Sequence, residues 1–204
     1  MYINTFKYRP EDVDCKLCTE YSKKTGCTAN GCPYLAERME AGVVGYAEAV
    51  METFARNRSL HSRLDQLIRQ FPGNLWEDER HRRHMDWQRT VLGCRPKRDT
   101  PQFFAAMYLI TATETLYARA ANCLCKSGAN FHYTCLPEIS EQDFVLLSAA
   151  RAIYERSGSI SMAELADREI IGDDAFRLII NALLIARYGI DALKLTGGAQ
   201  DGGR

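Results

Sequence analysis

Hydrophobic positions along the chain recur mainly at helical spacing. From Pro33 to residue 57, apolar residues fall every three or four positions and so share one face of a helix: Leu35, Met39, Val43, Tyr46, Val50 and Phe54. Gly42 and Gly45 lie inside this run, where they either permit close packing or mark a break. No stretch alternates apolar and polar residues as a strand would, so the pattern predicts an all-α fold.

Helix caps and turn residues divide the middle of the chain. Ser59 is placed to cap a helix over 60–71, which the turn sequence "PGN" ends. The next predicted helix, over 75–93, has acidic residues near its start, as the helix dipole favours. A long apolar run over 101–124 has β-branched residues at its centre and capping-box spacing there. We therefore expect this run to break near Thr111–Thr113.

The C-terminal third contains the clearest helix starts. Ser161 and Glu164 have the spacing of a capping box, and Ser140 with Asp143 forms a similar pair. Asp173 is placed to cap the last helix, which is apolar around most of its circumference. Such a helix is typically buried, whereas a helix that reads the major groove of DNA needs an exposed polar face. The pattern therefore argues against DNA reading by this helix.

These elements predict a compact multi-helix domain with about six to eight helices. We expect four regions: a cysteine head at 1–33, a helical pair at 34–73, a helical domain at 74–196 and a disordered tail at 197–204. The N-terminus lacks the apolar core of a signal peptide, and the longest apolar stretch is shorter than the ~20 residues that span a bilayer. We expect a soluble, cytoplasmic protein that does not associate with membranes.

Four cysteines lie close together in the cysteine head. Cys15, Cys18, Cys27 and Cys32 follow the pattern C-x2-C, eight residues, then C-x4-C. Four thiolates at this density suit the tetrahedral coordination of zinc, and a site closed by four protein ligands has no open position for catalysis. The sequence therefore predicts structural zinc. An iron–sulfur cluster and a redox dithiol or disulfide remain alternatives.

A second group of candidate ligands lies further along the chain. Cys123, Cys125, His132 and Cys135 are numerous enough for a second metal site. Their spacing matches no pattern that we can assign, which favours small buried hydrophobic residues instead. Cys94 has no partner nearby in the sequence.

Charge is spread unevenly, although Lys and Arg together equal Asp and Glu at 26 each. The segment 56–98 holds eleven basic and five acidic residues, and ten of the basic residues are arginine. A polyanion or an acidic protein would meet this segment first, although a solvated helix face would look the same. We take the predicted binding face to be Arg80, Arg82, Arg83, His84 and Arg89.

Motifs for catalysis are weak. His81 and His84 are spaced to lie on one helix face, but the surrounding arginines oppose a bound cation. A phosphate contact or a core histidine beside Trp87 explains them better. No phosphate loop, dinucleotide fingerprint or nucleophile elbow is present. We expect no catalytic site. The enzyme alternative would use His81 and His84, or the region from Cys123 to Cys135, with a metal.

One resemblance bears on the setting. From about Trp76 onward, the sequence resembles a small all-helical domain family of unknown function. Three segments carry this resemblance: "ERHRRHMDW", "DTPQFFAAMYLITATETLYARA" and "EQDFVLLSAARAIYERSGSISMAELADREIIGDDAFRLIINALLIARYG". That family occurs in phages and conjugative elements of Gram-positive gut bacteria. The resemblance implies a mobile genetic element as the setting, and no activity, cofactor or catalytic residue. The cysteine head is an addition relative to the shorter members and resembles heads of other mobile-element proteins.

The sequence thus predicts an accessory binding protein of a mobile element. It would engage a protein or nucleic-acid partner through the arginine-rich helix face. The alternatives are a protein–protein adaptor or an inhibitor of host defence that does not contact nucleic acid, and the metal-dependent enzyme described above.

Overall fold

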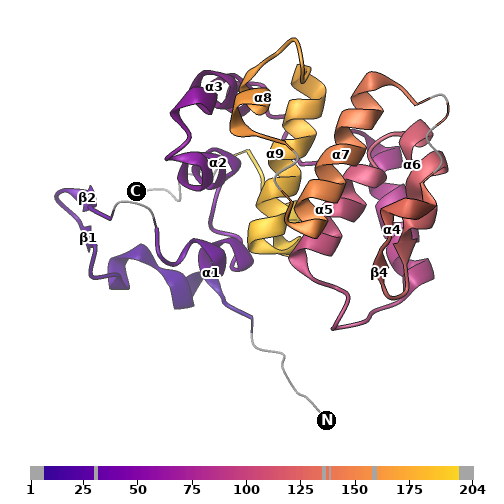
Figure 1. Cartoon of the computed structure of the whole chain (residues 1–204). Coiled ribbons are helices and arrows are strands. Elements are labelled where there is room, and N and C mark those ends of the chain that lie inside the picture. Colours follow the sequence, from indigo (N-terminus) through magenta and orange to yellow (C-terminus); the bar gives the residue numbers. More distant parts are fainter. Residues whose placement is uncertain (1–6, 30–31, 135–136, 138, 158–159, 198–204) are drawn as a thin grey trace.

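The computed structural model describes residues 7–29, 32–134, 137, 139–157 and 160–197. Within these ranges the chain forms nine α-helices, and its two β-hairpins have strands of two residues each (Figure 1). The all-α class is confirmed. The α-helices are α1 (Leu35–Glu40), α2 (Tyr46–Phe54), α3 (His61–Arg69), α4 (Glu79–Leu92), α5 (Pro101–Ile110), α6 (Glu114–Ala120), α7 (Glu141–Glu155), α8 (Met162–Ala166) and α9 (Asp173–Tyr188).

Short 3₁₀ segments and the two hairpins connect the helices. The 3₁₀ segments are η1 (Pro10–Val13), η2 (Cys15–Leu17), η3 (Arg58–Leu60), η4 (Ala121–Cys123), η5 (Phe131–Tyr133) and η6 (Ile190–Lys194). The antiparallel hairpins pair β1 (Tyr21–Ser22) with β2 (Gly26–Cys27) and β3 (Leu124–Cys125) with β4 (Gly128–Ala129).

The run of apolar positions after Pro33 is broken at Gly42. Gly42 has φ +74°, a left-handed conformation that ends α1. The N–H of Val43 donates to the carbonyl of Arg38, and the N–H of Gly42 donates to that of Met39, both at 3.0 Å. This pair of bonds is the Schellman arrangement that satisfies the last carbonyls of a helix. The break therefore turns one predicted helix into α1 and α2.

Helices α5, α7 and α9 pack against one another at the centre of the fold (Figure 1). The side chains of α5 from Ala105 to Ile110 are all inaccessible to solvent, so this helix is surrounded by its neighbours. The buried apolar residues form one cluster that runs from Leu35 to Leu195. The core thus continues past the "PGN" turn. The predicted division into four regions stays a prediction, and residues 198–204 of the predicted tail lie outside the described residues.

Several predicted caps are confirmed. The hydroxyl of Ser140 accepts a hydrogen bond from the N–H of Asp143 at 3.0 Å. Ser161 and Glu164 form the predicted capping box. The break between α5 and α6 is also confirmed. The side chain of Thr113 caps α6 by accepting a hydrogen bond from the N–H of Leu116.

Two predicted caps are wrong. Ser59 lies inside η3, and α3 begins two residues later without a side-chain cap. Asp173 is the first residue of α9 rather than its cap, which is Gly172. The carboxylate of Asp173 instead contacts two arginines, Arg63 at 2.9 Å and Arg168 at 3.6 Å. These tertiary ion pairs explain why the carboxylate does not cap its own helix.

Arg63 joins α3 to the segment between α8 and α9. Its side chain is buried, and its guanidinium donates to the carbonyls of Leu165 at 2.7 Å and Ile171 at 2.8 Å. The guanidinium also lies 4.0 Å from the centre of the Phe176 ring. A planar group with five donors can satisfy these buried carbonyls together with the Asp173 carboxylate, which an ammonium group could not do in the same geometry.

Within the described ranges, no helix is long and apolar enough to cross a bilayer.

Replacing Arg63 by methionine should destabilise the protein by roughly 3 kcal/mol, as for a buried ion pair that loses one partner. The buried carbonyls of Leu165 and Ile171 would lose their donors, while the aliphatic volume would be kept. Urea unfolding followed by circular dichroism would measure the change. Arg151→Met is the control, because Arg151 is an exposed arginine of α7 that pairs only with Glu155 among the described residues. Equal stability loss in both variants would contradict the role given to Arg63.

Candidate functional site

The four cysteines of the head are carried by three consecutive local structures. Cys15 begins η2, and the N–H of Cys18 donates to the Cys15 carbonyl at 3.0 Å. Cys27 ends the β1–β2 hairpin opposite Tyr21, next to Gly26 with φ +73°. Cys32 lies three residues before α1, and its carbonyl accepts a hydrogen bond from the N–H of Leu35 at 3.4 Å. The C-x2-C pair thus lies on one tight turn, and the other two cysteines lie at a hairpin end and at a helix start.

All four cysteines line one cavity of about 360 Å³. None of them forms a disulfide. Among the described residues, however, no group of three or more His, Cys, Asp or Glu side chains is drawn together closely enough to hold a metal ion. The structure therefore gives the four thiols a common cavity without the tight tetrahedral geometry that a metal requires.

Arg38 and two glutamates connect this cavity to α2. The N–H of Cys32 donates to a carboxylate oxygen of Glu52 at 3.1 Å. The guanidinium of Arg38 approaches the sulfur of Cys32 at 3.7 Å and forms an ion pair with Glu48 at 2.5 Å. Burial lowers the pKa of Arg38, but the hydrogen bonds to Glu48 and Cys32 and the attraction of nearby negative charge together raise it above its ordinary value, so Arg38 stays charged. Sequence reasoning missed this cation, because only the fold brings α1 and α2 together around Cys32.

The predicted arginine face lies on α4, and its charge is largely neutralised. Arg80 pairs with Asp78 at 3.1 Å and with Glu114 at 3.3 Å. Arg82 pairs with Glu79 at 2.5 Å. These exposed carboxylates offset most of the positive potential that the sequence suggests for this segment.

The remaining predicted binding residues behave differently from one another. Arg89 lies 3.9 Å from Asp86, whereas Arg83 donates to the backbone carbonyl of Glu79 in its own helix and forms no ion pair with the described residues. His84 does not join the arginine face, because its ring stacks on Tyr117 with the ring centres 4.4 Å apart.

The outer face of α4 carries two exposed apolar side chains between its arginines. Trp87 is 63% exposed and Val91 is 51% exposed, and they lie one helical turn apart. The expectation that Trp87 packs beside a core histidine is wrong. The aromatic neighbours of His81 are instead Trp76, with ring centres 5.1 Å apart, and Tyr108 at 4.5 Å.

His81 is a core residue whose two ring nitrogens are both occupied. Nδ1 accepts a hydrogen bond from the N–H of Glu77 at 3.1 Å, so the proton lies on Nε2, which donates to the carbonyl of Tyr108 at 2.8 Å. Burial lowers the pKa of His81 to about 4, so the ring is neutral near pH 7. Neither nitrogen can bind a metal or accept a proton from a substrate. This geometry removes His81 from the enzyme alternative.

The second cysteine group is brought together only in part. Cys123 is fully buried, and burial raises the pKa of its thiol to about 12. The thiol of Cys125 donates to the carbonyl of Asn122 at 3.5 Å, and His132 is exposed on η5. Cys135 lies outside the described residues, so the second metal site stays a prediction. A buried neutral thiol such as Cys123 serves as a small apolar side chain.

Comparisons with known proteins add no assignment: no family model, no curated protein and no solved structure matches the chain.

The neutral state of His81 should make folding stability depend on pH. The unfolded chain takes up a proton as the pH falls below about 6.5, whereas the folded chain does so only near pH 4. The His81 contribution is therefore complete above about pH 6.5 and decreases toward pH 4, by about 3 kcal/mol at most. Urea unfolding between pH 7 and pH 4.5 would measure this slope.

His81→Phe should unfold at lower urea concentration and show a flatter pH dependence. His132→Gln is the control, because the imidazole of His132 makes no hydrogen bond to the rest of the described chain and should leave the slope intact. If stability changes with pH equally in His81→Phe and in the unmodified chain, the proposed neutral state of the buried His81 is wrong.

Proposed function

We propose that this chain is a non-catalytic binding protein, in which zinc stabilises the cysteine head and the outer face of α4 binds a protein partner. The observation that carries the binding proposal is the exposure of Trp87 and Val91 on the solvent-facing side of a helix whose inner face is buried. Exposed tryptophan flanked by arginine is the composition that most often dominates protein–protein binding energy.

The charges on α4 favour a protein partner over nucleic acid. Phosphate binding needs unpaired cations, yet Arg80 and Arg82 are engaged by carboxylates on their own surface. Arg89 also lies near a carboxylate, that of Asp86. A protein surface can match this mixed pattern of charges around an apolar centre. The mobile-element setting that the sequence resemblance implies is part of this proposal.

The strongly perturbed titratable groups support a non-catalytic role. Burial raises the pKa of Tyr46, Tyr108 and Cys123 and lowers that of His81. These groups lie in the core, where no substrate can reach them. Catalytic groups with shifted pKa values instead need access to a cleft.

Four thiols in one cavity support zinc in the head. The guanidinium of Arg38 in α1 lies beside the sulfur of Cys32, and its positive charge would offset part of the charge of four thiolates. Four cysteines would complete the coordination of zinc, so its contribution would be folding energy for a loop with few buried residues. The head between η1 and β2 has no buried side chain among its described residues, so a metal would supply the stability that a core cannot.

Protein purified without added metal should contain about one zinc per chain, measured by mass spectrometry of the metal content. Cys15→Ser combined with Cys18→Ser should lose the zinc and increase proteolysis before α1. The control is Cys94→Ser, because Cys94 is exposed in the loop after α4. Metal-free protein would overturn structural zinc, and iron with visible absorption would establish the iron–sulfur alternative.

A photo-crosslinking amino acid at position 87 should capture one protein in cells that naturally make this chain. The same amino acid at position 133 is the control, since Tyr133 is similarly exposed at 60% and lies on η5 rather than on α4. Adducts specific to position 87 and sensitive to Val91→Asp would support the proposal. Adducts with nucleic acid, or equal adducts from both positions, would contradict it.

A further inference from the structure

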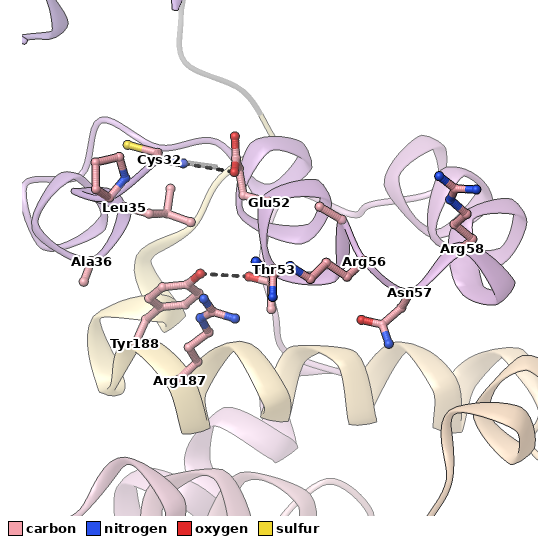
Figure 2. Close-up of a pocket in the computed structure, with 12 residues that line it drawn as sticks. Cys32, Leu35, Ala36, Glu52, Thr53, Arg56, Asn57, Arg58, Arg187 and Tyr188 are labelled. Carbon is pink, nitrogen blue, oxygen red and sulfur yellow. Dashed lines mark hydrogen bonds between the residues drawn. The ribbon is translucent and has the colours of Figure 1, made fainter. Parts of the chain in front are cut away.

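A second surface, separate from α4, is hollowed into an open pocket of about 1060 Å³. It lies where the start of α1, the end of α2, the α2–α3 connection and the C-terminal end of α9 meet (Figure 2). Its volume is at the upper end of the range for small-molecule sites. The pocket therefore has room for a ligand larger than a single ion.

Three arginines line this pocket, and none of them forms an ion pair with a carboxylate of the described residues. Arg56 and Arg58 come from the α2–α3 connection, and Arg187 comes from the last turn of α9. None of the ion pairs within the described chain involves these three residues, in contrast to the paired arginines of α4. Figure 2 shows Arg56 and Arg187 directed toward the space beside Thr53, with Arg58 further along the connection. All three arginines are exposed, and three guanidinium groups outnumber the one carboxylate among the described lining residues, which favours binding of an anion.

The polar groups of the pocket wall are arranged around this positive charge. Thr53 donates its hydroxyl proton to the carbonyl of Ala49 at 2.6 Å, so the contact of 3.0 Å with Tyr188 has the tyrosine as donor. The Tyr188 oxygen can still accept a hydrogen bond from a ligand hydroxyl. Glu52 is the one carboxylate among the described lining residues, and it is engaged by the N–H of Cys32.

The wall near α1 is apolar. Leu35 and Ala36 line the pocket on this side, opposite the arginines of the α2–α3 connection (Figure 2), and Pro33 is a further lining residue. A ligand that fills the pocket would therefore place anionic groups against guanidinium groups and a less polar group against α1. Nucleotides combine these two features.

We propose that this pocket binds a small phosphate-bearing ligand of nucleotide size, with Arg56 and Arg187 as the phosphate ligands and Arg58 at the rim. Arginine matches phosphate geometry through paired N–H donors, and such charge-assisted bonds are stronger than neutral ones. The proposal is independent of the α4 face, and either one can fail without the other.

Calorimetric titration of the full chain with ATP, pyrophosphate and adenosine tests this inference. ATP and pyrophosphate should bind, with an affinity that falls as salt rises, and adenosine should bind at least about tenfold more weakly than ATP. Arg56→Gln combined with Arg187→Gln should weaken ATP and pyrophosphate by at least about tenfold. Arg151→Gln, which removes an exposed and ion-paired arginine of α7, should leave both affinities unchanged.

Circular dichroism of the double variant separates loss of binding from loss of folding, and Arg58→Gln supplies a second variant at the rim. The inference is overturned if neither ATP nor pyrophosphate binds at millimolar concentration, or if adenosine binds as tightly as ATP. It is also overturned if the double variant, folded, retains full affinity. A single-stranded oligonucleotide that binds more tightly than ATP and depends on the same arginines would assign the pocket to nucleic acid instead.

Discussion

A buried hydrogen-bond network around Asn181 determines how the helices meet. The Asn181 side chain of α9 accepts a bond from the Tyr46 hydroxyl of α2 at 2.8 Å and donates to the carbonyl of Leu75 at 3.2 Å. The hydroxyl of Tyr108 in α5 donates to the same carbonyl, and His81 of α4 donates to the carbonyl of Tyr108. Polar groups buried in a low dielectric cost about 1–3 kcal/mol each when they lose a partner. Helices α2, α4, α5 and α9 are therefore held in positions that satisfy all of these groups.

This constraint places both proposed binding surfaces at the edge of the network. With His81 directed into the core, Trp87 and Val91 are exposed on the solvent-facing side of α4. With Asn181 at the centre of α9, the end of that helix brings Arg187 and Tyr188 to the surface beside α2. Neither surface depends on an unusual backbone conformation. In each, the exposed side chains belong to a helix, α4 or α9, whose inner face is fixed by buried polar contacts.

The sequence predicts the helices well because their signals are local. Apolar spacing, the Ser140 cap and the Ser161–Glu164 capping box each depend on a few neighbouring residues. Contacts between distant segments leave no such signal. Asn181 lies in the apolar last helix, yet it is buried and hydrogen-bonded to partners on α2, on α5 and in the α3–α4 connection. In the same way, the sequence shows Arg56 only as part of a basic segment, whereas in the fold Arg56 lines a pocket together with Arg187 at the end of α9. The cysteine spacing predicts structural zinc, which stays a prediction: the fold gives the four thiols a common cavity, but no metal-holding group is formed among the described residues.

The cysteine head and the arginine pocket share a wall, and this links the two proposals physically. Cys32 lines both cavities, and its N–H is held by Glu52, which also lines both. Arg38 approaches the same cysteine from α1 and is tied to α2 through Glu48. A metal that draws Cys32 toward the other three thiols would therefore act on the start of α1, which forms the apolar side of the pocket. Zinc in the head would thus have a consequence beyond loop stability, because it would fix the wall against which a ligand of the arginines has to pack.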